Sequence, residues 1–558
     1  MLTSCGTVPE AIAEVRMQNT EVTRKSAFRS AFCILTSALV LWLLFFHGLA
    51  DRDLWSSHEA RAGQDAQTIL HEGRWGLPGL YDGQTELQKP PLYYWLVALV
   101  ARCQGGTVDA WSVRLPAALA ALGGVLLVFG LMTARGRPLA GLIAAAVLAT
   151  ALHYTWLARV GRIDMPLALA VGTAVCCFFL ASGGGKPILL ASGGRSSLAS
   201  GGRKPPVECD AATAPSPTGG LRPSLAFVLR FLGYLAIAAA VMLKGPIGAV
   251  LPAVVLAAWT IAERRGRSWR ELSRHLLHSS LGWGVPLVLA LVLPWYLWAD
   301  AQTGGKFLQR FLWFDNVERA FGGDDLLRGH PFWFYGPRFL VDFLPWSPLV
   351  LVAGWWVLRN CRPDDPEARF GLVWLVSIAL LLSLVRFKRA DYLLPAYTGA
   401  ALLLGCMAER CLQSAVQVRR RAAGFAALLL IAAGGWFVQV HALLPAQEPH
   451  REQRSFAAEI RRRAPLPGYV LFFRAESHAL AFHVGRPLYT FLEWENLDVW
   501  AGMPGLHYVV MPPECAVEWP DHVTSGRLEE VLRNTDLAGG RHEQPLVLMR
   551  IDNRNKAQ

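Results

Sequence analysis

The stretch DRDLWSSHEARAGQDAQTILHEGRWGLPGLYDGQTELQKPPLYY, residues Asp51–Tyr94, is a dense polar segment that directly follows the apolar run Ser30–Ala50. It carries seven acids against four bases. Ser56-Ser57-His58-Glu59 fits a capping box, so we expect a helix that runs to about Leu70. Lys89-Pro90-Pro91 predicts extended backbone, because proline disfavours the helical conformation for the residue before it. A polar loop of this density, held against a bilayer, is where we expect the chemistry.

The composition predicts a polytopic helical membrane protein. Of the 558 residues 53% are hydrophobic and 17% are charged, against about 25% charged in soluble proteins. Apolar runs of about 17–25 residues recur along the chain, and a crossing helix needs about 20. The net charge of +12 lies mostly in short loops between these runs, as the positive-inside bias predicts. We therefore expect no nucleic-acid partner. The ten cysteines show no metal-ligand spacing and indicate no disulfide framework.

The loop charges predict the sidedness and the domains. The polar tail 1–29 ends in bases and should be cytoplasmic, which places the C-terminus outside after eleven spans, or as many as about thirteen. The multi-span domain is 30–445, with a first outer loop at 51–112 and a low-complexity cytoplasmic loop at 182–223. The predicted spans lie at about 30–50, 113–133, 139–157, 165–181, 225–243, 247–262, 277–299, 339–358, 370–385, 392–408 and 422–444.

Two segments outside these spans have a predicted structure of their own. Leu92–Cys103 is apolar but too short to cross, so we expect an interfacial helix with Tyr93, Tyr94 and Trp95 at headgroup level. Residues 446–558 contain no long apolar run, and we expect them to form a small α/β domain on the outer side. The predicted elements are strands at 468–474, 487–491, 507–511 and 545–551, and helices at about 452–463 and 524–535.

Several bases are exceptions to the positive-inside pattern, because they fall on the outer side. They are Arg159 and Arg162 beside Asp164, the cluster Arg386–Tyr392, Lys89 and, at a short break, Lys244. Cations beside apolar spans on that face indicate an anionic ligand near the interface, such as a lipid phosphate or diphosphate. The alternative is that each base only anchors a helix end.

Three residues of the polar segments are candidate catalytic groups, each with a structural alternative. Glu59 is either a base or only the reciprocal partner in the capping box. Asp164 takes part directly, or it only starts a helix or forms an ion pair. His58 is a further candidate base or ligand.

The order of short motifs resembles the GT-C membrane glycosyltransferases, specifically the aminoarabinose-transferase and protein-mannosyltransferase-like branch. The elements run in order over about residues 30–410. They are His58-Glu59-Ala60-Arg61-Ala62, Gly73-Arg74-Trp75-Gly76-Leu77-Pro78, Glu86-Leu87-Gln88-Lys89-Pro90-Pro91-Leu92-Tyr93-Tyr94-Trp95, Arg114-Leu115-Pro116, Arg162-Ile163-Asp164-Met165-Pro166, Leu243-Lys244-Gly245, Pro294-Trp295-Tyr296, Pro331-Phe332-Trp333-Phe334-Tyr335 and Tyr392-Leu393-Leu394-Pro395-Ala396-Tyr397.

The resemblance implies transfer of a sugar, with inversion, from an undecaprenyl- or other polyprenyl-phosphate donor at the outer face of a bacterial inner membrane. Lipid A, a protein hydroxyl and an envelope glycan are open as acceptors. Glu59 or His58 would be the base, with Asp164 assisting. The donor phosphate would be held by Lys89, Arg162, Arg386, Lys388, Arg389 and Tyr392. Substrate positioning would fall to Arg61, Gln88, Tyr93 and Lys244.

The chain departs from the family pattern at three positions. His58 stands where the family has its first acid, Gln88 replaces the acid before the lysine, and Glu86 stands where a tyrosine is expected. We therefore carry no metal or other cofactor forward, although a divalent metal is an open alternative. A transporter or flippase for a lipid-linked sugar, and a binding protein without catalysis, are the alternative functions.

Overall fold

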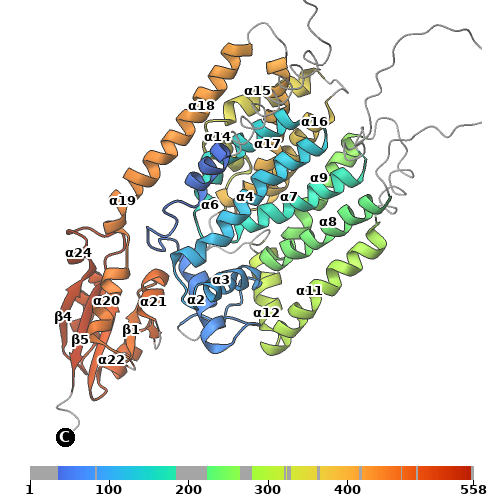
Figure 1. Cartoon of the computed structure of the whole chain (residues 1–558). Coiled ribbons are helices and arrows are strands. Elements are labelled where there is room, and N and C mark those ends of the chain that lie inside the picture. Colours follow the sequence, from blue (N-terminus) through green and yellow to red (C-terminus); the bar gives the residue numbers. More distant parts are fainter. Residues whose placement is uncertain are drawn as a thin grey trace, which may run out of the picture.

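The computed structural model describes residues 35–81, 85–183, 223–263, 280–318, 322, 329–360, 365–413, 418–466, 468–485 and 488–553. The predicted tail 1–29 and nearly all of the predicted low-complexity loop 182–223 lie outside these residues. The described chain forms a helical bundle with a small α/β domain at one end (Figure 1). The predicted fold class is thereby confirmed.

Six described helices are long and apolar enough to cross a membrane, or up to eight if each of two bent pairs is one span. The long ones are α4 (Ala110–Ala134), α7 (Asp164–Ala181), α8 (Pro223–Lys244), α11 (Gly282–Gln302), α16 (Pro366–Leu384) and the helix that contains α18 (Val418–Val438). The bent pairs are α5 (Pro138–Thr150) with α6 (Leu152–Ala158), and η3 (Phe332–Phe334) and α14 (Tyr335–Asp342) with α15 (Ser347–Asn360). Every predicted span coincides with a described helix, but three of them, at Leu35–Phe45, α9 (Ile247–Ala262) and α17 (Leu394–Gln413), are not among the six to eight.

Two predicted straight spans are broken, and their breaks contact each other. The axis bends by 70° between α5 and α6, and by 119° between α14 and α15. At the first break the Leu152 N–H donates to Leu344 O at the second break, at 2.9 Å. The Trp346 indole donates to Thr150 Oγ1 at 3.0 Å. A break in a helix leaves backbone N–H and C=O groups without partners inside the helix. The bond from Leu152 to Leu344 pairs two of these groups, as irregular backbone inside a membrane bundle requires.

The first outer loop folds largely as predicted. Ser56 caps α2 (Ser57–Glu72) in a complete capping box, and Gly73 ends it in the left-handed conformation. The predicted interfacial helix is α3 (Leu92–Cys103). Tyr93 and Tyr94, expected at headgroup level, are buried where α3 packs against α2 and α4, so they face protein.

The C-terminal domain is built on a five-stranded sheet of order β2-β1-β3-β5-β4. Strand β1 (Val470–Phe473) pairs in parallel with β2 (Leu488–Phe491) and β3 (Leu506–Met511). Strand β5 (Val547–Asp552) pairs antiparallel with both β3 and β4 (Leu528–Arg533). Its helices are α20 (Arg454–Arg463), α21 (His478–Val484), α22 (Trp494–Ala501), α23 (Pro513–His522) and α24 (Asn534–Leu537). Alternate β1 residues enter two separate apolar clusters, so both faces of the sheet are covered.

One element of this domain was predicted wrongly. The segment 524–535 was expected to be helical, but Leu528–Arg533 is the edge strand β4, paired with β5. Its Leu, Glu and Arg residues favour helix locally, and pairing with a buried neighbouring strand overrides that preference.

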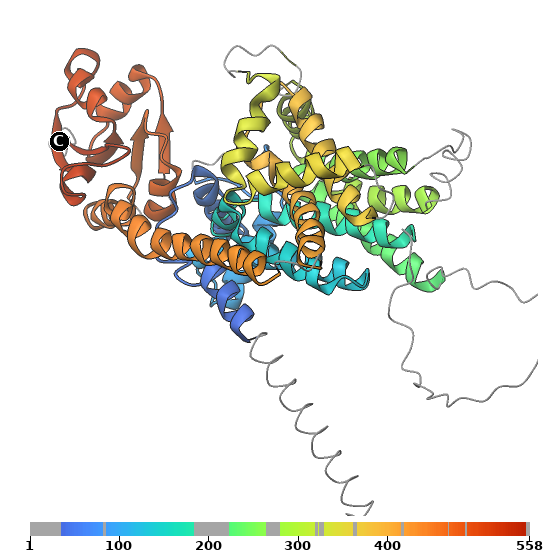
Figure 2. The same ribbon diagram turned by 90° about the horizontal axis from the view of Figure 1, so that it is seen from above.

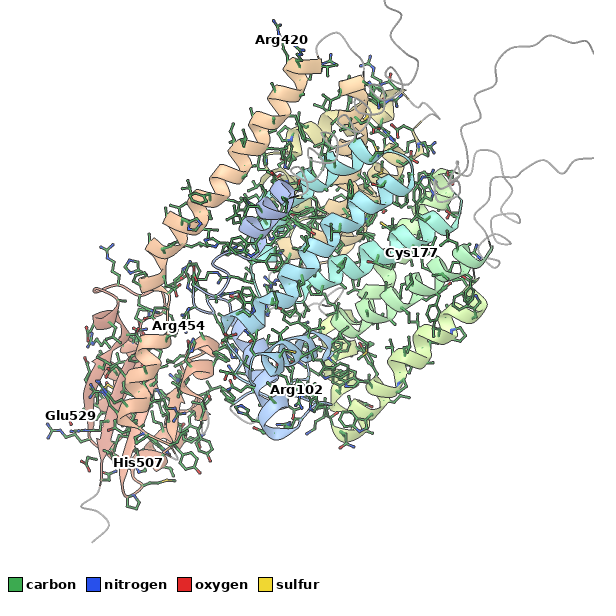
Figure 3. All side chains as sticks on the ribbon, in the orientation of Figure 1. Arg102, Cys177, Arg420, Arg454, His507 and Glu529 are labelled. Carbon is green, nitrogen blue, oxygen red and sulfur yellow. The ribbon has the colours of Figure 1, made fainter. Side chains whose placement is uncertain are left out.

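The α/β domain lies at the same end of the bundle as α2, α3 and α12 (Lys306–Leu308) (Figure 1). Seen from above, it sits to one side of the bundle and is joined to it by α18 and α19 (Leu444–Gln447) (Figure 2). Figure 3 shows Arg420 at the far end of α18 and Arg454 at the junction with the domain. The polar loops and the extramembrane domain therefore share one side of the helices.

Candidate functional site

A cavity of about 130 Å³ lies at the end of the bundle where the segment that carries Lys89 meets the start of α7 and the end of α8. Its polar lining comes from segments far apart in the sequence: Lys89, Asp164, Lys244, Asp315, Asn316, Asp391 and Tyr392. The rest of its wall is mostly apolar: Leu167, Ile247, Leu251, Phe311, Leu382, Val385, Phe387 and Pro395. A cavity lined by both charged and apolar side chains suits an amphiphilic ligand, whose polar head and apolar tail need different surroundings.

Chain geometry explains why these charged side chains meet. Asp164 is the first residue of α7, and Lys244 is the last residue of α8, whose end packs against that start. Gly245 then turns the chain with φ of +78°, and a Cβ there would lie 2.4 Å from the Phe311 ring. Asp391 belongs to the 3-10 turn η4 (Ala390–Leu393), which precedes α17.

The charges form a connected, alternating cluster. Lys244 Nζ lies 2.5 Å from Asp164 Oδ1 and 4.2 Å from the centre of the Tyr392 ring. Arg162 Nη2 lies 3.2 Å from Asp164 Oδ2 and 2.7 Å from Asp391 Oδ2. Asp164 is only 3% exposed, so its two cationic partners offset the cost of burying the carboxylate.

Lys89 reaches the cavity from the first outer loop, on a segment held in place by Arg61. The Arg61 guanidinium lies 2.7 Å from Glu86 Oε2 and donates to Gln88 Oε1 at 3.3 Å. The Gln88 N–H donates to Glu86 Oε1 at 2.7 Å. Arg61 and Gln88 therefore support the backbone that presents Lys89.

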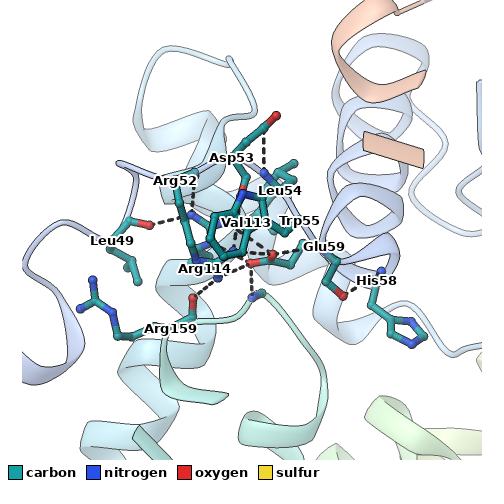
Figure 4. A network of polar contacts seen from close by, with 12 residues as sticks. Leu49, Arg52, Asp53, Leu54, Trp55, His58, Glu59, Val113, Arg114 and Arg159 are labelled. Carbon is teal, nitrogen blue, oxygen red and sulfur yellow. Dashed lines mark hydrogen bonds and ion pairs between the residues drawn. The ribbon is translucent and has the colours of Figure 1, made fainter. Parts of the chain in front are cut away.

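The His58 side chain points away from the network around its neighbour Glu59 (Figure 4), and it lies close enough to the charged cluster to feel the charges of Arg162 and Asp164. Burial is the largest cause that lowers the pKa of His58, followed by the charges of Arg162, Arg389 and Lys89, and together they bring it to about 3. Asp164 acts in the opposite direction. The imidazole is therefore neutral at physiological pH and has a ring nitrogen free of a proton.

Glu59 lies on a different face of α2 from His58, in a closed network (Figure 4). Its carboxylate is completely buried, 2.6 Å from Arg114 Nε and 3.1 Å from Arg52 Nη1. It also accepts the Gly161 N–H at 2.9 Å. Burial alone would raise its pKa, but the charges of Arg114 and Arg52 and these bonds lower it to about 2. Glu59 was expected as a base, but in this structure its carboxylate is buried among these partners and does not line the cavity.

Known proteins resemble this chain in sequence and in fold. Residues 88–194 match the family described as "Dolichyl-phosphate-mannose-protein mannosyltransferase". The undecaprenyl phosphate-alpha-4-amino-4-deoxy-L-arabinose arabinosyl transferase of Edwardsiella ictaluri is 26% identical over 74% of this chain and 67% of its own length. The enzyme of that name from Pectobacterium atrosepticum is 28% identical over 65% and 56%. The chain spans about three fifths of the length of the curated relatives that it matches.

Solved structures decide the fold. ArnT from Cupriavidus metallidurans bound to undecaprenyl phosphate superposes with a TM-score of 0.70 at 17% identity, over 93% of this chain and 98% of that one. The archaeal oligosaccharyltransferase AglB from Archaeoglobus fulgidus gives 0.55 at 13% identity, over 88% and 70%. The chain has the GT-C fold. The resemblance that the order of motifs indicated is confirmed.

Only part of the basic cluster Arg386–Tyr392 lies at the cavity. Arg389 Nε lies 3.7 Å from Asp391 Oδ2, close to the site. Arg386 is exposed and donates to Gly322 O at 2.9 Å. The Lys388 ammonium is buried and donates to the carbonyls of His330 and Val385. The structure thus brings Arg389 and Tyr392 to the site, and it ties Lys388 to backbone.

Tyr93 also differs from its expected role in substrate positioning. It is 1% exposed, and its hydroxyl donates to Val113 O at 2.7 Å. It therefore packs α3 onto the start of α4, behind the cavity wall.

Several functional candidates of the GT-C site were missed in the sequence. Asp315 and Asn316 line the cavity from η2 (Gln309–Glu318), in an outer loop whose balanced charge gave no signal. Asp391 was visible only as part of a basic cluster. His153 lies inside the predicted span 139–157, and an ionisable residue within a membrane span usually indicates a functional role. That signal could have identified it. Across the described residues, no three His, Cys, Asp or Glu side chains are placed to hold a metal ion.

Proposed function

We propose that this chain is an inverting glycosyltransferase that moves a sugar from an undecaprenyl-phosphate or other polyprenyl-phosphate donor to an acceptor hydroxyl at the outer face of the inner membrane. The observation that carries the proposal is the single cavity in which Lys89, Lys244 and Asp164 meet beside an apolar wall. A donor phosphate would bind Lys89 and Lys244, and the polyprenyl chain would lie against the apolar wall.

The donor phosphate is both the binding handle and the leaving group. Lys89 lines the cavity, and Arg162 is paired with two carboxylates that line it. Both would lie near the negative charge that grows as the bond from the anomeric carbon to the phosphate oxygen breaks. Fixed cations in a site shielded from water stabilise such charge more in the transition state than in the ground state. Arg389 and the Lys244–Tyr392 pair complete the cationic side.

His58 is the proposed general base. The acceptor oxygen attacks the anomeric carbon from the face opposite the phosphate, His58 takes the hydroxyl proton, and polyprenyl phosphate leaves with the bonding electrons. A single displacement of this kind inverts the anomeric centre. Asp164 already raises the proton affinity of His58, and it would stabilise the imidazolium once that forms.

The low pKa of free His58 is consistent with this role, because the donor changes its surroundings. The pKa is about 3 when Arg162, Arg389 and Lys89 stand near the ring without a bound anion. A phosphate placed among these cations cancels part of their effect, so the pKa rises when the donor binds. The base then becomes stronger when a substrate is present.

The transporter alternative has less support. A transporter site is expected near the bilayer midplane between repeated halves, whereas this cavity lies at the ends of α7 and α8. The broken pairs α5–α6 and α14–α15 are the feature in its favour. Sugar transfer and sugar translocation, measured in the same proteoliposomes, separate the two functions.

The direct test is transfer by the purified full chain in proteoliposomes. The first donor to try is undecaprenyl phosphate-alpha-4-amino-4-deoxy-L-arabinose, the compound in the names of several relatives, with lipid A, envelope glycan and protein fractions as acceptors. We expect a product of inverted configuration and its loss in His58→Ala. Mass spectrometry of envelope lipids and glycans after deletion of the gene identifies the acceptor. Absence of transfer from any polyprenyl-phosphate sugar, with translocation present, would overturn the proposal.

A further inference from the structure

His153 lies where the two broken helix pairs meet, outside the cavity lining described above. It is the second residue of α6, next to Leu152, whose N–H bonds to Leu344 O across the two breaks. Its side chain is only 7% exposed. An ionisable group buried inside a membrane bundle is costly, and such groups usually serve a function.

Both ring nitrogens of His153 face polar partners. Nε2 lies 3.3 Å from Asp391 Oδ1. Nδ1 lies 3.2 Å from the Tyr397 hydroxyl and 3.6 Å from Asp342 Oδ2. With its proton on Nε2 the ring donates to Asp391, and Nδ1 faces the Tyr397 hydroxyl, which also bonds to Asp342. The ring is therefore oriented from both sides.

Asp391 connects His153 to Arg162 at the cavity wall. Its Oδ1 faces His153, and its Oδ2 lies 2.7 Å from Arg162 Nη2. The second partner of Arg162 is Asp164 Oδ2 at 3.2 Å. The Arg162 guanidinium is thus held between two carboxylates of the cavity wall, and one of these is fixed by His153.

Asp391 needs such a partner because its own support is slight. It stands on a single 3-10 turn, and Arg389 Nε lies only 3.7 Å from the same oxygen that binds Arg162. Without the bond to His153, the carboxylate can rotate toward Arg389 and release Arg162. A guanidinium that loses its alignment loses its directed hydrogen bonds to a phosphate.

We propose that His153 is a positioning residue that aligns Arg162 with the donor phosphate by fixing Asp391. This inference rests on the proposed function, because it assigns the phosphate of the donor to Arg162. It adds a residue that touches no substrate and acts through two intervening side chains.

Two substitutions separate this role from a packing role. In His153→Gln the amide nitrogen can occupy the place of Nε2 and keep the bond to Asp391. In His153→Asn the shorter amide can reach only the side of Nδ1, toward Tyr397. Tyr154→Phe is the matched control, because it removes the neighbouring buried hydroxyl, which bonds to Ala121 O at 2.8 Å, far from Asp391 in the network.

The readout is binding of undecaprenyl phosphate to the full chain in nanodiscs, beside its thermal stability. We expect a loss of about tenfold in affinity for His153→Asn, the size of one bond to a charged group. We expect affinity close to wild type for His153→Gln and Tyr154→Phe. Asp391→Asn should lose a similar factor, and the double variant of His153→Asn and Asp391→Asn should be no worse than either single variant.

The outcomes that overturn the inference are specific. Wild-type affinity in a folded His153→Asn, or equal losses in His153→Gln and His153→Asn, removes the role of the Nε2 bond. If His153→Asn does not fold, wild-type affinity in a folded Asp391→Asn overturns the inference instead, because Asp391 then does not align Arg162. If the wild-type chain itself does not bind undecaprenyl phosphate, the proposed function fails first, and this inference fails with it.

Discussion

Lys244 Nζ lies 2.5 Å from Asp164 Oδ1, so the last residue of one membrane helix is paired with the first residue of another. The pair holds the two helix ends together at the mouth of the cavity. It also leaves the second oxygen of Asp164 to Arg162. One carboxylate therefore fixes two cations whose placement the proposed chemistry needs.

Asp164→Asn should reduce transfer per folded molecule by about a hundredfold, because the amide keeps the shape but gives up the charge that holds the cations and supports His58. The measurement is single-turnover transfer at saturating donor. Asp51→Asn, an exposed carboxylate in the same outer region, is the matched control. Full activity in Asp164→Asn would remove this residue from the mechanism.

Lys89→Ala should weaken binding of undecaprenyl phosphate by about tenfold to a hundredfold, since a bond from an ammonium to a phosphate is worth about 1.5–3 kcal/mol. Arg102→Ala is the control, because Arg102 lies on the same loop but is exposed at the end of α3 (Figure 3). Equal losses in both variants would mean that surface charge, and not the cavity, attracts the donor.

His58→Ala should lower the turnover number by about 10²–10⁴-fold, the usual contribution of a general base. His58→Asp should recover part of the loss, because it restores an acceptor for the proton at the same position of α2. The comparison is made at saturating donor, so that binding does not enter. Equal activity in His58→Ala and the wild type would leave the reaction without the proposed base.

His58 also gives a pH prediction with a definite sign. Its pKa is about 3 in the free protein, and we expect undecaprenyl phosphate to raise it. If the complex holds the proton more tightly, binding must strengthen, relative to a variant without the imidazole, as the pH falls toward the new pKa. The measurement is the ratio of affinities of wild type and His58→Asn between about pH 8 and 5. Titration of the phosphate itself is common to both proteins, so a constant ratio would contradict the prediction.

Glu59→Gln should lower the stability of the fold, and any loss of transfer should follow from that loss of stability. Arg52 and Arg114 are buried around this single carboxylate, and removing its charge leaves them uncompensated, at a cost of about 3–5 kcal/mol. The measurement is the yield and melting temperature in detergent. Glu72→Gln at the exposed end of α2 is the control. A normal melting temperature with no transfer would instead restore Glu59 to the mechanism.

The roles of His58 and Glu59 show where the sequence stops being informative. Both follow the same capping serine, and consecutive helical residues point about 100° apart, so only one of them can face a given cavity. The capping box predicts the helix but not the rotation of α2 against α4 and α7. That rotation depends on Arg114, Arg52 and Gly161, whose contacts with Glu59 join segments far apart along the chain.

Other successes and failures have the same physical basis. The spans were found because their hydrophobicity is a local property. The candidate site was suggested by Lys89, Lys244 and Arg162, which are exceptions to the positive-inside pattern. The breaks at Ala151 and Pro345 were missed, since the bonds that stabilise them join residues nearly two hundred positions apart. Strand β4 was missed because only its pairing with β5 makes it a strand.

Asp53 connects the C-terminal domain to the segment just before α2, the helix that carries His58. Its carboxylate lies 2.6 Å from His483 Nε2 and 3.3 Å from Arg454 Nε, and it accepts the Gln453 N–H at 2.8 Å. Burial alone would raise its pKa, but the hydrogen bond and charge of His483 and the Gln453 N–H outweigh burial, so the pKa lies below its usual value. A carboxyl group whose pKa is lowered by docking stabilises the docked state above its usual pKa, and this contribution is lost as the pH falls through the lowered value.

Asp53→Asn should therefore loosen the domain at neutral pH by about 1–3 kcal/mol, and acid should weaken docking in the wild type but have less effect in the variant. Hydrogen exchange in α21 and in the first turn of α2 is the measurement, with exposed Asp521→Asn as the control. Because α2 holds His58, the turnover number should fall together with the loss of protection. Faster exchange at full turnover would show that the domain does not position the base, and unchanged exchange would show that Asp53 does not hold the domain.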